Sequence, residues 1–234
     1  GQVNRSMIRL SHINVETPMV LDSNSPLTLA VENPGEYYTF VNELSDAFNG
    51  EESEFSFWSD DVRILPEKSG DIILSPFFFD ATDKKIIALL YKKLQKNYLD
   101  GAFLSDFNEI NARLENFLYD LCSTVGFSLE HNCLSIEDTL KVCGVKPSKN
   151  YDTLIEKLVC YINIFIELKS VSFFVLVGFR DVLSDEDLIA LIDHCKLNKV
   201  GLFFLESGKC RKRLQEERKI IITEDLCEIV ENIA

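Results

Sequence analysis

Lysine side chains gather in one stretch of this sequence. Between Thr82 and Leu99 there are five lysines and a single acidic residue, Asp83. On an ideal helix with about 100° per residue, four of these lysines project from one sector next to an apolar face: Lys85, Lys92, Lys93 and Lys96. Such a face can bind the phosphates of a polyanion. A solvated face without a ligand is the commoner outcome for a run of charge, so both alternatives stay open here.

A second basic cluster lies between Glu206 and Lys219, where six basic residues stand against three acids. Its centre consists of Lys209, Arg211, Lys212 and Arg213. The whole chain has a formal charge of −14, which argues against a protein coated in nucleic acid. Nine acids, and no lysine or arginine, lie from Glu32 to Asp61. Basic clusters on an acidic chain can still bind a polyanion if they line one surface.

The sequence lacks the loop with which many ATPases bind phosphate. That loop follows the first buried strand and reads G-x-x-x-x-G-K-[ST], so that its backbone amides, lysine and hydroxyl hold phosphate and magnesium. Here the predicted strand at residues 26–31 is followed by Glu32-Asn-Pro-Gly-Glu-Tyr-Tyr. This segment has one glycine and no lysine, and its two carboxylates would repel a triphosphate. We therefore expect no nucleotide hydrolysis, and no enzyme activity.

Two carboxylates remain as candidates for other chemistry. Asp181 and Glu206 stand at the carboxyl ends of two predicted strands, where parallel sheets bind ligands or metals. Capping and solvation are the favoured interpretation of both. His12, His131 and His194 have no partner at catalytic spacing. His194 adjoins Cys195, but neighbours on a helix point about 100° apart.

The composition indicates a globular intracellular protein. The seven cysteines are odd in number and show no C-x-x-C spacing, which favours free thiols in a reducing cytoplasm. No apolar run approaches the roughly 18 residues that a membrane helix needs. We expect Met7 to be the true start and residues 1–6 to be an expression scar.

The order of predicted elements indicates an α/β fold with a parallel sheet. Residues 173–178, 184–195 and 200–206 read as a strand, a capped helix and a strand, which together form a right-handed βαβ unit. Further strands are predicted at residues 8–11, 18–21, 26–31, 71–78 and 220–223, and a closing helix at 224–233. Residues 82–170 read as almost entirely helical. We therefore predict an α/β head domain, 7–81 and 171–234, split by a helical domain, 82–170.

Three stretches of the sequence resemble one known family. They are Asp71-Ile-Ile-Leu-Ser-Pro-Phe-Phe-Phe-Asp80; Leu140-Lys-Val-Cys-Gly-Val-Lys146 with Tyr151-Asp-Thr-Leu-Ile-Glu-Lys157; and Leu183-Ser-Asp-Glu-Asp with Leu202-Phe-Phe-Leu-Glu206. Together they are similar to the small adaptation protein of type II-A CRISPR systems, the Csn-two family. The match runs in order from about Leu10 onward.

The resemblance implies a non-catalytic protein. Members of this family have a split α/β head like an ATPase core without its phosphate loop, and a helical leg. They form tetrameric rings that bind double-stranded DNA ends in a lysine-lined channel during spacer acquisition. They act with the CRISPR integrase complex and the type II effector nuclease. The resemblance thus makes duplex DNA the expected ligand of the basic residues.

One departure from the family concerns calcium, which the resemblance implies as a bound ion. Where relatives alternate carboxylates, this chain has Leu121, Thr124, Gly126 and Ser128. Only Glu130 keeps its place, with Asn132 as a weaker oxygen donor. Calcium takes six to eight oxygen ligands, largely from carboxylates. We expect calcium binding to be weak or absent and no cofactor to be required.

Two other functions compete with a DNA-binding ring. One is a nucleotide-dependent enzyme with a degenerate site at Asp181 and Glu206, which nucleotide binding would support. The other is a protein-interaction scaffold without DNA contacts, which would bind neither nucleotide nor duplex.

Overall fold

The computed structural model describes residues 7–208, 214 and 216–231, which form two compact units. The head unit contains the described residues up to Asp80 and those from Asn150 onward, and the helical unit is Ala81–Lys149. The expected expression scar at residues 1–6 lies outside the described residues. The division predicted from the sequence placed the second boundary after residue 170 instead.

The second boundary moves because helix α6 (Leu154–Lys169) packs into the head. Leu158, Ile162 and Phe165 on α6 are buried. The Phe165 ring also meets the ring of Phe174 edge-on, with 6.1 Å between centroids. The predicted helical domain ended at residue 170, whereas the structure ends it at Lys149. A helical period in the sequence does not reveal against which unit a helix packs.

A six-stranded sheet forms the centre of the head. Its order is β10-β9-β3-β8-β7-β6, parallel except for β10. The strands are β3 (Leu27–Val31), β6 (Gly70–Ile73), β7 (Phe173–Val177), β8 (Gly201–Ser207), β9 (Arg218–Ile222) and β10 (Glu228–Glu231). All residues of β3 and β7 are buried, as expected for strands covered on both faces.

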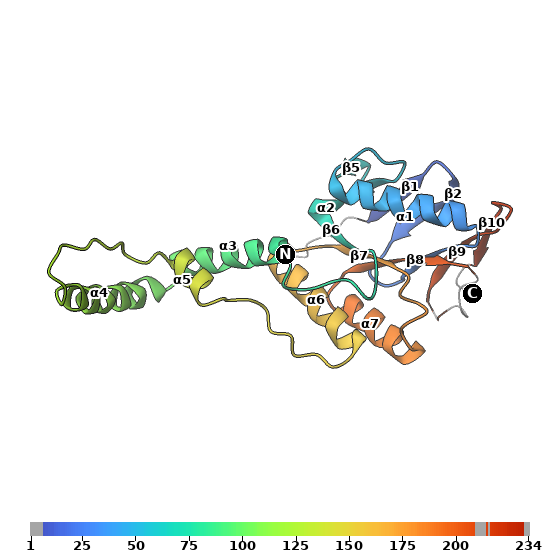
Figure 1. Cartoon of the computed structure of the whole chain (residues 1–234). Coiled ribbons are helices and arrows are strands. Elements are labelled where there is room, and N and C mark those ends of the chain that lie inside the picture. The colour runs from blue at the N-terminus through green and yellow to red at the C-terminus, as the bar shows by residue number, and fades with distance from the viewer. Residues whose placement is uncertain (1–6, 209–213, 215, 232–234) are drawn as a thin grey trace. The chain divides into compact units, whose positions relative to one another are not determined.

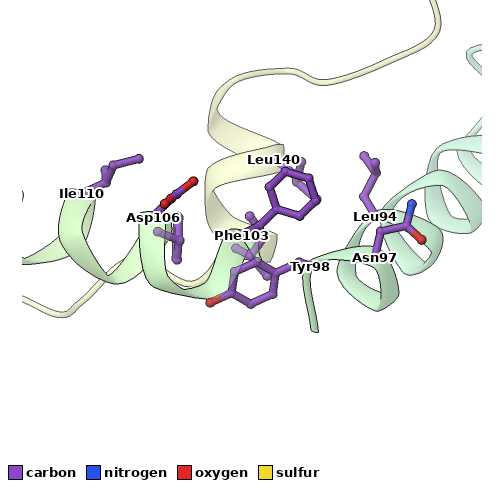
Figure 2. Close-up of a pocket in the computed structure, with 9 residues that line it drawn as sticks. Leu94, Asn97, Tyr98, Phe103, Asp106, Ile110 and Leu140 are labelled. Carbon is purple, nitrogen blue, oxygen red and sulfur yellow. The ribbon is translucent and has the colours of Figure 1, made fainter. Parts of the chain in front are cut away.

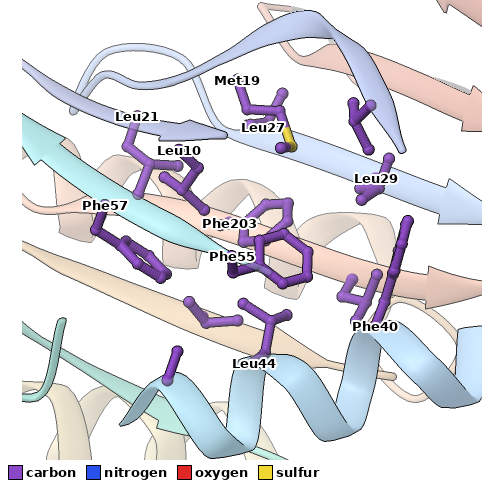
Figure 3. Packing of buried hydrophobic residues seen from close by; sticks show 14 of the residues in the cluster. Leu10, Met19, Leu21, Leu27, Leu29, Phe40, Leu44, Phe55, Phe57 and Phe203 are labelled. Atoms are coloured by element: carbon purple, nitrogen blue, oxygen red, sulfur yellow. The ribbon is translucent and has the colours of Figure 1, made fainter. Parts of the chain in front are cut away.

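Layers on both faces of the sheet explain this burial (Figure 1). One face is covered by α1 (Pro34–Asn49) and by an antiparallel sheet of order β2-β1-β4-β5. The other is covered by α6 and α7 (Asp185–Leu197). Figure 3 shows the core of the first face, where Phe40 and Leu44 of α1 lie near Phe55, Phe57 and Phe203. The small sheet comprises β1 (Ile8–His12), β2 (Val15–Leu21), β4 (Ser56–Ser59) and β5 (Val62–Ile64), and the short helix α2 (Pro66–Ser69) follows it.

The predicted βαβ unit is present as β7, α7 and β8. Ser184 caps α7, and its side chain accepts a hydrogen bond from the Asp187 backbone N–H at 3.1 Å. The buried stripe of the helix consists of Leu188, Leu191, Ile192 and Cys195. The α/β fold class with a parallel sheet is therefore confirmed.

Two predicted elements differ from the structure. The strand expected at 71–78 ends at Ile73, because a turn at Ser75 and Pro76 stops the pairing. The closing helix predicted at 224–233 is wrong. Thr223 and Cys227 close a turn through their backbones, with Leu226 at φ 61°, and β10 then pairs antiparallel with β9. Backbone pairing with a neighbouring strand overrides a local helical pattern.

Among the described residues, no helix combines the length and apolar character required to cross a membrane. The cysteines in this part of the chain are free thiols: Cys122, Cys133, Cys143, Cys160, Cys195 and Cys227. Burial raises the pKa of the Cys195 thiol to about 12, and the neighbouring His194 ring bonds instead to Asn163 at 2.8 Å. These two residues are therefore not a nucleophile and its base.

Candidate nucleic-acid interface

Helix α3 (Lys84–Asp100) carries all four lysines of the predicted basic face. Asp83 caps its first turn, where its side chain accepts a hydrogen bond from the Lys85 backbone N–H at 2.7 Å. Ile86 is buried on the adjoining apolar face. The cap and the continuous run of helix-forming residues fix the helix from its first turn onward.

The lysines of α3 are presented to solvent. Lys85, Lys92 and Lys96 are exposed, and Lys93 is half-buried. No acidic residue lies between Lys84 and Leu99, and the acid of α3 is Asp100, four residues after Lys96. Elsewhere in the helical unit, Arg113 pairs with Glu109, and Lys141 with Glu137, each at 2.6 Å. Helix α3 thus carries five lysines and one carboxylate.

Helices α4 (Phe103–Cys122) and α5 (Ile136–Val142) hold α3 in place. The Tyr91 hydroxyl of α3 donates a hydrogen bond to the Leu140 carbonyl of α5 at 3.0 Å. The ring of Tyr98 meets that of Phe107 on α4 edge-on, at 5.6 Å. On α5, a hydrogen bond from Lys141 lowers the pKa of Glu137, and a bond from Gln95 of α3 contributes. These contacts orient the lysine face of α3.

The second predicted cluster, Lys209, Arg211, Lys212 and Arg213, lies outside the described residues. Its membership of a DNA-binding surface therefore stays a prediction.

The calcium candidates lie in the extended segment between α4 and α5. Glu130 and Asn132 are both exposed there. Within the described ranges, no three His, Cys, Asp or Glu side chains come together as a metal site would require. One carboxylate and one amide do not supply the oxygens that calcium takes, so these residues do not fit a calcium site.

At the carboxyl end of the sheet, Glu206 is part of the folded framework. It is 2% exposed, and its Oε1 accepts hydrogen bonds from the backbone N–H groups of Phe179 at 3.0 Å and Arg180 at 3.1 Å. Burial raises the pKa of Glu206 to about 7, despite these bonds. Burial also raises the pKa of Tyr37, helped by the charges of Glu206 and Asp181. Asp181 itself is exposed.

The space beside Glu206 has no phosphate cradle. Strand β3 ends at Val31 and α1 begins at Pro34, and the Asn33 side chain caps α1 by accepting from the Glu36 N–H at 3.0 Å. The connection is too short for a loop that could wrap a phosphate. The Asn33 side chain also occupies the N-terminal Glu36 N–H of α1, which a phosphate would otherwise use.

A buried ion pair that the sequence does not reveal lies below the carboxyl end of the sheet. The guanidinium of Arg180 contacts the carboxylate of Glu217, and both side chains are at most 1% exposed. The Thr28 hydroxyl donates to the same carboxylate. Glu217 also accepts from the Leu214 N–H at 2.9 Å. The pair joins residues 37 positions apart, and no local pattern marks it.

Helix α4 exposes an apolar face that the sequence spacing could have revealed. No residue of α4 is buried. Its apolar residues recur at alternating intervals of four and three, the heptad spacing of helices that pair with other helices: Phe103, Phe107, Ile110, Leu114, Phe117 and Leu121. Phe103, Ile110 and Phe117 are each about 60% exposed.

One end of this face continues into an apolar pocket of about 400 Å³ between α3, α4 and α5. Figure 2 shows Leu94 and Tyr98 of α3, Phe103 and Ile110 of α4, and Leu140 of α5 around it. The helical unit therefore has a basic surface and a separate apolar one.

Comparison with known sequences assigns the chain to a family. The sequence model described as CRISPR-associated protein (Cas_Csn2) matches residues 47–226, which is most of the chain. The chain belongs to the Cas_Csn2 family. The resemblance found in the sequence is thereby confirmed, and the protein is part of a family involved in CRISPR systems.

Two Csn2 relatives match nearly the whole chain. CRISPR-associated protein Csn2 of Streptococcus agalactiae is 22% identical over 228 residues, covering 97% of this chain and 100% of the relative. Csn2 of Enterococcus faecalis is 18% identical over 215 residues, covering 89% and 94%. This chain is therefore a distant member of the Csn2 family with the length of its relatives.

Among solved structures, similar chains include ATP-binding cassettes. One is a nucleotide-free ATP-binding cassette from an ABC transporter, with TM-score 0.46, 10% identity, and coverage of 97% of this chain and 92% of that one. Another is cbiO1 from Clostridium perfringens, part of the ABC transporter complex cbiONQ, with TM-score 0.44, 13% identity, and coverage of 94% and 86%. These scores are too low to establish a shared fold, so the fold class of this Csn2-family chain rests on its own strand order.

Proposed function

We propose that this Csn2-family protein forms closed homo-oligomeric rings, most simply tetramers, that bind the ends of double-stranded DNA during spacer acquisition. The exposed lysine face of α3 is the observation that carries this proposal. Lysine ammonium groups on a helix that carries a single carboxylate are suited to phosphates, and their binding releases the counterions condensed on the duplex. Contacts to phosphates alone give binding that does not depend on base sequence.

The charge and the apolar face of α4 support the proposed oligomer. One copy with a charge of −14 has little basic surface for a duplex. A closed ring gathers several copies of the α3 face around one axis. The heptad-spaced side chains of α4 provide an apolar seam for a helix of another copy.

The proposed protein catalyses no reaction and requires no cofactor. It would present DNA ends to the CRISPR integrase complex and act beside the type II effector nuclease. Nucleotide turnover that disappears in Asp181→Ala or Glu206→Ala would contradict the non-catalytic part of the proposal.

The decisive experiment measures the mass of the oligomer and compares its binding to linear and circular DNA. Size-exclusion chromatography with light scattering, with and without a short linear duplex, is expected to give an oligomer that takes up the linear duplex. Relaxed circles of equal length should compete poorly, because a closed ring is threaded only from an end. A monomer at micromolar concentration would overturn the ring. Equal competition by circles would overturn end binding.

A further inference from the structure

Two adjacent phenylalanine side chains are exposed at a turn just after β6. Phe77 is 68% exposed and Phe78 is 87% exposed. Their neighbours are not: Pro76 is buried and Phe79 is half-buried. The pair therefore projects between two neighbours, Pro76 and Phe79, that are more buried.

Hydrogen bonds and ring contacts hold this turn in shape. The Phe78 N–H donates to the Ser75 carbonyl at 3.4 Å, and the Phe77 N–H donates to the Ser75 hydroxyl at 3.3 Å. Pro76, second in the turn, restricts the backbone further. The Phe79 ring meets Tyr161 edge-on at 5.3 Å, and Lys157 Nζ lies 4.1 Å from the centroid of the same ring. The exposed rings thus stand on an anchored base.

Exposure of both rings forgoes a large apolar contribution to folding. Burial of a phenylalanine side chain contributes to stability, and turn positions readily accept polar residues. A single exposed apolar residue is ordinary, whereas a contiguous exposed patch indicates a binding surface.

The chemistry of a DNA end complements such a pair. Along its length a duplex presents phosphates and groove edges, and the flat faces of its bases are open only at the terminal pair or where bases are unpaired. Aromatic side chains stack on any base, because every base has a π-face. Along the chain, Lys84, the first residue of α3, follows Phe78 by six positions.

We propose that Phe77 and Phe78 stack on the terminal bases of the duplex that this protein binds. The inference rests on the proposed function and adds to it a site that reads the open end of the duplex. Stacking occurs without preference for base identity. It favours ends whose last pairs are already open, since those bases need no unpairing.

The test compares two 30-base-pair duplexes, one fully paired and one with three mismatched pairs at each end. We expect the wild type to bind the mismatched duplex about tenfold more tightly, as one base–aromatic stack would give. Phe77→Ala with Phe78→Ala should lose this preference, so that it binds the two duplexes with equal affinity. Ile13→Ala with Val62→Ala, which removes exposed apolar side chains elsewhere in the head, should behave as the wild type.

The outcomes separate this inference from the function on which it rests. If the wild type binds neither duplex, both fail. If it binds both equally, or if the double variant keeps the preference, duplex binding stands and stacking is wrong. If the double variant changes the oligomer measured by light scattering, the pair belongs to a protein interface and the stacking inference is overturned.

Discussion

Glu206 is a carboxyl group that the fold holds in a place poorly suited to a charge. Burial raises its pKa from 4.5 to about 7, although two backbone N–H groups bind its Oε1. The folded protein therefore holds the proton more tightly than the unfolded chain does. The resulting stabilisation is fully present below about pH 4.5 and is lost as pH rises through about 7.

Glu206→Gln should remove this pH dependence. A glutamine amide keeps an oxygen for both N–H groups and never ionises, so the variant should gain stability relative to the wild type as pH rises from 4.5 to 8. The relative gain is up to about 3 kcal/mol, since each pKa unit corresponds to about 1.4 kcal/mol. Urea unfolding of both proteins at several pH values and one protomer concentration measures it. Parallel stability curves over that range would contradict the buried-carboxyl explanation.

A second prediction concerns how the ion pair between Arg180 and Glu217 affects the free energy of unfolding. Arg180→Met leaves a buried carboxylate without its cation, which costs about 3–5 kcal/mol of unfolding free energy. Adding Glu217→Gln removes the stranded charge and should restore most of the loss. Unfolding of the single and double variants checks this, and an equally unstable double variant would show that shape rather than charge governs the site.

At the scale of elements, α4 has an apolar face on which no residue is fully buried. Ile110→Glu with Phe117→Glu places charges on the apolar face of α4. This variant should therefore dissociate the oligomer into species of lower molecular mass. Ala112→Glu with Asn116→Glu adds the same charge outside the heptad positions and serves as the control. Light scattering at equal concentration compares them. An unchanged mass in the first variant would exclude α4 as the seam.

The segment between α4 and α5 bears on calcium. Because Glu130 and Asn132 are exposed and the described residues contain no cluster of three His, Cys, Asp or Glu side chains, chelation of calcium with EGTA should leave both the oligomer and duplex binding unchanged. Binding assays with EGTA and with added calcium measure this. A large loss of affinity on chelation would mean that other oxygen atoms have replaced the missing carboxylates.

Sequence patterns correctly predicted the strands that are covered on both faces of the sheet and the helices that have a local apolar stripe. The apolar runs of β7 and β8 read correctly as strands, because both faces of the sheet are covered. The spacing of Leu226, Ile229 and Val230 fitted a helix equally well, and only pairing with β9 decides otherwise. The Arg180–Glu217 pair and the place of α6 depend on contacts distant in sequence. Of the predicted site, the lysines of α3 lie on one helix as expected, whereas the second basic cluster remains a prediction.

At the scale of the whole molecule, charge is separated. The chain has a net charge of −14, yet α3 has no acid between Lys84 and Leu99. Such separation lets an acidic protein bind a polyanion on one surface while the rest of it repels the duplex. In the proposed ring, this arrangement restricts DNA to the surface that the α3 helices share.

The affinity for linear duplex across a salt series, measured for three proteins, tests the central claim most directly. These are the wild type, Lys92→Glu with Lys96→Glu, and a control, Arg63→Glu with Lys68→Glu, which has the same charge change on exposed residues of the head. We expect the α3 variant to lose at least about tenfold in affinity on every duplex, with the log–log salt slope falling by about 0.9 for each lost phosphate contact. Its oligomer should stay intact and the control should resemble the wild type. An α3 variant that binds as tightly as the wild type, with an unchanged slope, would show that the lysine face is only solvated.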